Sequence, residues 1–326
     1  MPLYLWQEKS AAYEPVEARI RKGRQLLKEV YKRYQKSAEE FSNKQPQSVS
    51  GSGRLVYLTQ REMAVSSPSD TVVDLLGAED STTCHLVVLR QKETGVSLLT
   101  HVDGADVEGN VTQMITRIRE ATSYFGGYTK AWRFDLYLVG GFLDSEKATK
   151  YSEPLSESLL EEFNNNRLVE VDLKLACISK LNDVLRDNLH WPKVYGVCVD
   201  VKRGDVYPAT FPYQGPDLPL RHARHSSGGA ELLEVYDFKR GRLVIGPFEY
   251  FRIYGADRIL ELPDAWIRKN MSTSPSAEPE SFERNVRAAL QFTCDHPDSD
   301  AFFASGPREY YFNQQTNQWS VFLGQT

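Results

Sequence analysis

The stretch Ser81-Thr82-Thr83-Cys84-His85-Leu86-Val87-Val88-Leu89-Arg90 places a thiol where a polar loop runs into an apolar, partly β-branched segment. A second apolar segment follows and ends in Leu98-Leu99-Thr100-His101-Val102-Asp103-Gly104. Short runs of this composition, bounded by turn residues, predict neighbouring β-strands. Cys84 at the mouth of one strand and His101 at the end of the next can then meet across the pair. A cysteine hydrolase needs this pairing, because the imidazole takes the thiol proton before nucleophilic attack.

Two other interpretations of these residues stay open. Most single cysteines are small buried residues, so packing alone can also explain Cys84. A metal site could form if His85 and Asp103 joined the pair, although the chain has no close Cys-x-x-Cys or His-x-x-x-His unit to anchor one. His85 adjoins Cys84 and therefore points to the opposite side of the strand, which favours a structural role.

The composition is that of an ordinary soluble globular protein: 326 residues, of which 41% are hydrophobic and 25% charged. A net charge of −5 gives a nucleic-acid partner no electrostatic support. The four cysteines lie far apart, which argues against a disulfide framework and favours a reducing compartment. No secretory pattern and no bilayer-spanning apolar stretch is visible. We expect a cytoplasmic protein that could also enter the nucleus, without cofactor, metal or membrane partner.

The N-terminal part is expected to form a separate segment. Apolar residues recur near a 3.6-residue period over residues 15–43, which predicts a helix. Residues 42–54 contain Pro46 and Gly51-Ser52-Gly53 and are typical of a linker. We therefore divide the chain into residues 1–54, an appended helix with its linker, and residues 55–326, the main domain.

The main domain has more strands than helices, without regular alternation, which predicts an α+β fold with helices on mainly antiparallel sheets. A Pro- and Gly-rich stretch at 212–230 predicts a long loop with His222 and His225 exposed. Strands are expected at residues 55–59, 84–89, 96–100, 134–139 (closed by Gly140-Gly141), 168–178, 194–201, 206–211, 232–238 and 243–245, helices at 111–125, within 145–164 and at 281–294, and an aromatic edge hairpin at 302–323.

Several segments together resemble the protein N-terminal asparagine amidohydrolase family. They are the opening Met1-Pro2-Leu3, Tyr57-Leu58-Thr59-Gln60-Arg61-Glu62-Met63-Ala64-Val65, the two stretches around Cys84 and His101, Leu138-Val139-Gly140-Gly141-Phe142, Leu181-Asn182-Asp183, and Asn270-Met271-Ser272-Thr273-Ser274-Pro275-Ser276-Ala277-Glu278-Pro279. The resemblance runs in order from residue 1 to about residue 295 and departs at residues 14–43 and 202–245. It implies an α-β-β sandwich, similar to chemoreceptor glutamine deamidase and the cytotoxic necrotizing factor toxins.

The resemblance also implies an activity. Cys84 as nucleophile and His101 as proton shuttle would convert an N-terminal asparagine to aspartate and ammonia through a thioester. The aspartate would be arginylated by an arginyltransferase and become a signal for ubiquitin-dependent degradation in the N-degron pathway. The mature chain would start at Pro2, and this proline would lie at the active site. Its plain alternative is an unstructured terminus.

Supporting residues are less defined by the sequence. Ser81, Thr82, Thr83 and Asp103 are candidates for orienting His101, although the hydroxyl groups can equally bond their own turn and Asp103 can be a turn residue. Backbone N–H groups around Thr82–Cys84 could hold an oxyanion.

The free α-ammonium of such a substrate calls for an acidic or carbonyl-lined subsite. Glu62 and Glu278 lie in segments that match the family and are candidates for it, the alternative being two surface glutamates. Two rival functions also stay open: a cysteine deamidase or transglutaminase-like enzyme acting on internal residues, and a non-catalytic module that recognises N-termini.

Overall fold

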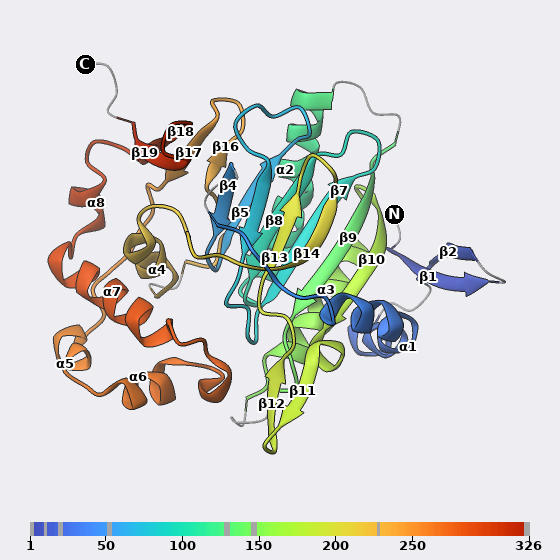
Figure 1. Cartoon of the computed structure of the whole chain (residues 1–326), viewed down its shortest axis with the longest axis horizontal. Helices are drawn as coiled ribbons and strands as arrows, with labels where there is room; N and C mark the ends of the chain where they lie inside the picture. Colours follow the sequence, from blue (N-terminus) through green and yellow to red (C-terminus); the bar gives the residue numbers. More distant parts are fainter. Residues whose placement is uncertain are drawn as a thin grey trace.

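The computed structural model describes residues 3–9, 12–18, 22–50, 54–126, 131–144, 149–226 and 229–322 (Figure 1). Its largest sheet has eight strands in the order β15-β5-β8-β7-β9-β10-β1-β2. They are β1 (Leu3–Lys9), β2 (Ala12–Glu17), β5 (Glu62–Ser66), β7 (His85–Gln91), β8 (Ser97–Val102), β9 (Arg133–Gly140), β10 (Glu170–Ile178) and β15 (Leu233–Glu234).

This sheet is mixed, whereas the expectation was of mainly antiparallel sheets; the pairs of the four-stranded sheet described below are all antiparallel. Strands β5, β8, β7 and β9 are antiparallel to one another in turn, whereas β9, β10 and β1 are parallel neighbours. The connection from β9 to β10 contains helix α3 (Ser152–Asn165), and a crossover through a helix returns the chain in the same direction.

The molecule is layered as helices, sheet and second sheet. Helix α2 (Val107–Gly126) and helix α3 pack on one face of the large sheet, and a five-stranded sheet lies over the other (Figure 1). The second sheet consists, in the order β3-β14-β13-β6-β4, of β3 (Gln47–Ser48), β14 (Asp205–Thr210), β13 (Val197–Asp200), β6 (Leu75–Ala78) and β4 (Leu55–Leu58). Because both faces are covered, every residue of β8 is buried.

The remaining elements include a four-stranded sheet and a two-stranded hairpin. They are β11 (Asp183–Arg186), β12 (Leu189–Pro192), β16 (Tyr236–Asp237), β17 (Arg242–Ile245), β18 (Arg308–Asn313), β19 (Gln318–Val321), α4 (Leu218–Ser226), α5 (Ala256–Leu260), α6 (Asp264–Met271), α7 (Phe282–Asp295), α8 (Ser299–Phe302), and the 3-10 helices η1 (Ser179–Asn182) and η2 (Pro275–Ala277). The expected C-terminal hairpin is β18–β19, with β19 at the sheet edge.

The N-terminal helix belongs to the core and is not an appended arm. Helix α1 (Gly23–Ser42) packs against β10 and α3, and its residues Leu26, Val30 and Ala38 are fully buried. The Tyr34 hydroxyl donates a 2.5 Å hydrogen bond to the Leu173 carbonyl of β10. The described residues before 55 thus share the hydrophobic core of the rest of the chain.

The expected helix at 15–43 begins only at Gly23, because residues 12–17 form the edge strand β2. Pro15 explains the difference, since it lacks the N–H that a helix interior requires and is tolerated in an edge strand. Helix α2 starts four residues earlier than expected, and α3 has Pro154 in its first turn, as expected.

The expected loop at 212–230 is wrong in its second half, where residues 218–226 form helix α4. Its proline, Pro219, lies in the first turn, where a missing N–H costs nothing. Leu220 and Ala223 are buried, so tertiary packing stabilises this short helix against the loop-like composition.

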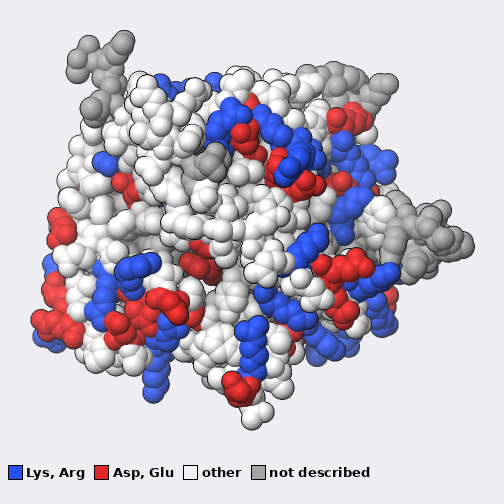
Figure 2. Space-filling model, viewed as in Figure 1, with Lys and Arg blue, Asp and Glu red and all other residues white. Residues whose placement is uncertain are grey.

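On the molecular face that Figure 2 shows, acidic and basic side chains are interspersed over the surface and form no broad region of one sign. Within the described part of the chain, no helix is both long and apolar enough to cross a membrane.

Candidate active site

Cys84 lies one residue before β7, and its carbonyl group is held from two sides. The Gly141 N–H donates to it at 2.8 Å and the Ser81 hydroxyl donates at 2.7 Å. Gly140 has a φ of 130°, and a Cβ at this position would lie 2.4 Å from the Cys84 carbonyl oxygen. Only glycine therefore allows the end of β9 to approach this loop. The glycine pair that closes a strand in the sequence thus also fixes the backbone of Cys84.

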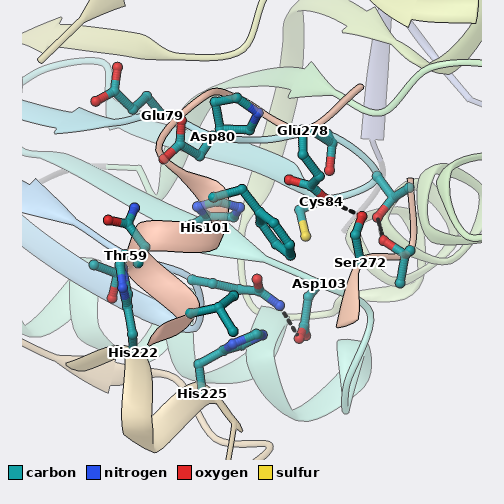
Figure 3. Close-up of a pocket in the computed structure, with 18 of the residues that line it drawn as sticks. Thr59, Glu79, Asp80, Cys84, His101, Asp103, His222, His225, Ser272 and Glu278 are labelled. Carbon is teal, nitrogen blue, oxygen red and sulfur yellow. Dashed lines mark hydrogen bonds between the residues drawn. The ribbon is translucent and has the colours of Figure 1, made fainter. Parts of the chain in front are cut away.

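His101 lies on β8, where it is paired with Leu86 of β7. The strand that follows Cys84 is therefore the direct neighbour of the strand that carries His101. Cys84 and His101 both line one cavity of about 470 Å³ (Figure 3). The imidazole is only 3% exposed, and neither ring nitrogen has a hydrogen-bond partner among the described residues. A buried imidazole with both nitrogens unpaired calls for an explanation, and a catalytic role supplies one.

Burial decides the protonation states of this pair. Burial lowers the pKa of His101 to about 4, and the nearby Asp103 carboxylate only partly opposes this. Burial raises the pKa of the Cys84 thiol well above its usual range, and the negative charges of Asp103 and Glu278 raise it further because they repel a thiolate. At neutral pH a neutral imidazole and a protonated thiol therefore share the cavity.

The candidates for orienting His101 have other partners. The Asp103 carboxylate accepts hydrogen bonds from the Arg61 guanidinium at 2.7 Å and from the Gln60 amide at 2.6 Å. Burial raises the pKa of Asp103, but Arg61 and these hydrogen bonds outweigh it and hold the pKa below its usual range. The structure thus brings Asp103 to the cavity without a hydrogen bond to His101.

The loop hydroxyl groups differ in their surroundings. Thr82 and Thr83 line the cavity, and the Thr83 hydroxyl lies 3.0 Å from that of Thr273. Ser81 does not line the cavity; it is fully buried, and its hydroxyl donates to the Cys84 carbonyl. Its contact matches the alternative in which the serine stabilises its own turn.

Three carboxyl groups, Glu79, Asp80 and Glu278, lie on one side of the Cys84–His101 pair in the view of Figure 3. Glu278 follows η2 and accepts hydrogen bonds from the Ser272 and Ser274 hydroxyls. Burial raises the pKa of Glu278 to about 7, that of Glu79 to about 7 and that of Asp80 to about 6. The cavity therefore holds several carboxyl groups that would gain from a cationic ligand.

The structure does not bring the other glutamate candidate, Glu62, to the cavity. Glu62 is buried and forms a two-pronged ion pair with Arg221 of α4, at 2.9 Å and 2.5 Å, and accepts the Thr59 N–H at 2.7 Å. The same guanidinium donates to the Tyr57 carbonyl at 2.6 Å. Glu62 therefore anchors α4 to the sheet, a role for a buried arginine–carboxylate pair.

Two residues whose sequence context predicts an exposed loop, His222 and His225 on α4, line the cavity. They lie on the other side of the Cys84–His101 pair from Glu79 and Asp80 (Figure 3). Burial, with Arg221 as the next cause for His222 and Arg61 for His225, lowers both pKa values to about 4. The i, i+3 spacing of the two histidines was the available signal, and it was hidden by the surrounding proline and glycine residues.

His85 has the expected structural role, because it is fully buried and its Nε2 lies 2.7 Å from the Ser156 hydroxyl. The part of the chain that the structure describes has no group of three or more His, Cys, Asp or Glu side chains that could hold a metal ion.

Pro2, a predicted site residue, lies outside the described residues. Its neighbour Leu3 is aligned, through β10 and β9, with Gln91 at the last residue of β7. Cys84 precedes the first residue of β7, so Leu3 and Cys84 lie at opposite ends of the sheet. A role for Pro2 at the active site stays a prediction, and the position of Leu3 lends it no support.

Comparison with known proteins adds a family to this geometry. The sequence model described as "Protein N-terminal asparagine amidohydrolase" matches residues 45–321. A protein of that name from Sus scrofa is 36% identical over 266 residues, which cover 81% of this chain and 83% of the relative. The protein of that name from Homo sapiens is 35% identical with the same coverage. A more distant relative of that name, from Arabidopsis thaliana, is 28% identical over 305 residues, 87% of this chain and 86% of the relative.

Proposed function

The chain belongs to the protein N-terminal asparagine amidohydrolase family, and from this premise we propose that it hydrolyses the side-chain amide of an N-terminal asparagine, releasing ammonia and leaving aspartate. The observation that carries the proposal is the meeting of Cys84 and an unpaired, buried His101 in one cavity with acidic groups beside them. This arrangement combines a nucleophile, a base and a counter-charge for an α-ammonium.

In the proposed reaction, His101 takes the thiol proton and the Cys84 sulfur attacks the side-chain carbonyl carbon of asparagine. The carbon–nitrogen bond of the resulting tetrahedral intermediate breaks as the imidazolium returns a proton to the nitrogen, which leaves as ammonia. The neutral imidazole then activates a water molecule, whose oxygen attacks the thioester. Cleavage of the carbon–sulfur bond releases aspartate and restores the thiol.

The negative charge on the oxygen of the tetrahedral intermediate needs donors. The N–H groups of Thr83 and Cys84 are the candidates, because they lie in the loop that the Gly141 and Ser81 contacts hold rigid. One such donor typically stabilises the transition state by about 3–4 kcal/mol.

The substrate's α-ammonium is proposed to bind at Glu278. In asparagine the α-nitrogen is only three bonds from the side-chain carbonyl carbon that the sulfur attacks, so it must bind close to the sulfur. Glu278 is near enough to raise the pKa of Cys84, and it faces the same cavity. A free ammonium would offset the repulsion between this carboxylate and its neighbour Asp80.

We further propose that the N-terminal aspartate made here is a substrate for an arginyltransferase and that this leads into ubiquitin-dependent degradation through the N-degron pathway. The support is the family resemblance, and the same resemblance is the support for a cytoplasmic and nuclear location. Protein substrates starting with asparagine would then be the partners of the enzyme.

Ammonia release from a short peptide that starts with asparagine tests the proposal. The natural protein should release ammonia from this peptide. It should release none from the same peptide with its α-amine acetylated. Cys84→Ser and His101→Gln should lose the activity, whereas Cys294→Ser, which removes a partly exposed thiol on α7, should retain it.

Turnover of the acetylated peptide, or of internal glutamine, would instead indicate a deamidase or transglutaminase-like enzyme acting on internal residues. Binding of the free peptide without any ammonia release would indicate a recognition module. Full activity in folded Cys84→Ser would exclude the thiol as nucleophile.

A further inference from the structure

One wall of the cavity takes no part in the proposed chemistry. Phe282, Asn285, Val286 and Ala289 all line it from α7, at the spacing of one helix face. Phe282 and Val286 are half-buried, and Met271 at the end of α6 adds a further apolar side chain to the lining. Such side chains cannot transfer protons or stabilise charge, so their function in an open cavity has to be sought in binding.

The three substituents on the asparagine Cα determine what reaches this wall. If the side-chain amide is at Cys84 and the α-ammonium is at Glu278, the main-chain carbonyl must point into the remaining part of the cavity. Glu278 is followed by Pro279 and then by the first residue of α7, Phe282, and all three line the cavity. A chain held at Glu278 therefore passes the start of α7 as it leaves the site.

We propose that this face of α7 is the subsite for the residue that follows the N-terminal asparagine, and that it selects an apolar side chain there. The inference rests on the proposed function. The second side chain would pack against Phe282 and Val286, which removes apolar surface of both partners from water. The Asn285 amide, which lines the cavity on the same helix face, would bind the peptide main chain beside it.

The adjoining wall, formed by helix α4, which packs against α7, fits this side chain less well. It carries His222 and His225 on α4, and Arg61 beside them. Arg61 is already engaged by Asp103 and by the Gly229 carbonyl, at 2.7 Å each. A wall of this kind would favour a polar second residue over leucine, so the two walls predict different substrate orders.

The experiment measures kcat/KM for four peptides that differ only in the residue after asparagine: leucine, alanine, lysine or aspartate. We expect leucine to exceed alanine by about tenfold, a typical gain for filling an apolar pocket, and aspartate to be the poorest. Val286→Asp should reverse the order so that lysine becomes the best. The matched control Gln291→Asp adds the same charge to the exposed side of the same helix and should leave the order unchanged.

The order of kcat/KM values that the natural protein shows for the four peptides tests the inference even if Val286→Asp fails to fold. Equal values for leucine and alanine, or a preference for aspartate, would overturn the α7 subsite while ammonia release still upholds the proposed function. Absence of ammonia from all four peptides would instead overturn the proposed function itself.

Discussion

Glu278→Gln should raise stability and lower activity at the same pH. Burial raises the pKa of Glu278 from 4.5 to about 7, with Asp80 as a further cause. At about 1.4 kcal/mol for each pKa unit, ionising this carboxyl destabilises the folded protein by about 3 kcal/mol. Because the side chain faces a cavity that water can enter, we expect a measured effect of about 1–2 kcal/mol.

The sign of this effect follows from the direction of the pKa shift. A raised carboxyl pKa favours the folded state below the unfolded value of 4.5, and this contribution is lost as the pH rises through about 7. Glutamine cannot ionise and keeps the oxygen that accepts from Ser272. Urea unfolding should therefore show Glu278→Gln to be more stable than the natural protein at pH 8 and similar to it at pH 5.

The activity should change in the opposite direction. Glutamine offers the substrate's α-ammonium a dipole in place of a charge, and a charged hydrogen bond is worth about 1.5–3 kcal/mol. We therefore expect kcat/KM at pH 8 to fall about 10- to 100-fold. In the natural protein kcat/KM should rise with pH through about 7 as Glu278 ionises, and the variant should lose this rise.

Glu280→Gln is the matched control, because Glu280 is exposed, two residues away and outside the cavity lining. It should leave the unfolding curve and kcat/KM unchanged. A Glu278→Gln protein with the natural kcat/KM at pH 8 would refute Glu278 as the ammonium partner. A variant less stable than the natural protein at pH 8 would refute the burial argument.

Two further predictions concern the scaffold of the site. Arg221→Met should lower the free energy of unfolding by about 3–5 kcal/mol, because it leaves Glu62 buried without its partner, and Arg221→Met with Glu62→Gln should recover part of this in urea unfolding. Gly140→Ala should lower both stability, by about 1–3 kcal/mol, and ammonia release, because the new Cβ would push away the Cys84 carbonyl at a positive φ; unchanged values in either assay would contradict this.

The sequence predicted the centre of the fold because local signals agree there with the tertiary structure. The apolar strands around Cys84 and His101 are buried on both faces, so their composition alone identifies them. The Lys-Arg-Gly segments ending at Gly204 and Gly241 also show such agreement, since each joins two antiparallel strands and both glycines have positive φ.

The outer parts were harder because distant partners determine them. Helix α4 is stabilised by Arg221 reaching Glu62, 159 positions away in the sequence, and no local pattern reveals such a pair. Its two cavity histidines were therefore assigned to an exposed loop. Burial by other elements likewise converted Glu62 from a candidate ligand into an anchor, which composition cannot show.

The free enzyme should hold Cys84, the proposed nucleophile, in an unreactive form until substrate arrives. Burial, Asp103 and Glu278 all raise the pKa of the Cys84 thiol, and no positive imidazole offsets them, because His101 is neutral at pH 7. A bound α-ammonium is an opposite charge that would lower the thiol pKa, typically by about 1–3 units.

The rate of alkylation of Cys84 by iodoacetamide, followed by mass spectrometry in a Cys294→Ser background, reports this pKa without substrate. It should rise with pH beyond 9 and show no plateau near neutrality. Glu278→Gln should speed alkylation, since it removes one of the neighbouring anions, even though it slows deamidation.

A plateau near pH 7 in the free enzyme would mean that a thiolate–imidazolium pair exists at rest. Slower alkylation in Glu278→Gln would show that its carboxylate does not act on the sulfur. If Glu278→Gln speeds alkylation but slows deamidation, the Glu278 carboxylate has two separate effects. It raises the pKa of the Cys84 thiol in the free enzyme, and it binds the α-ammonium of the substrate.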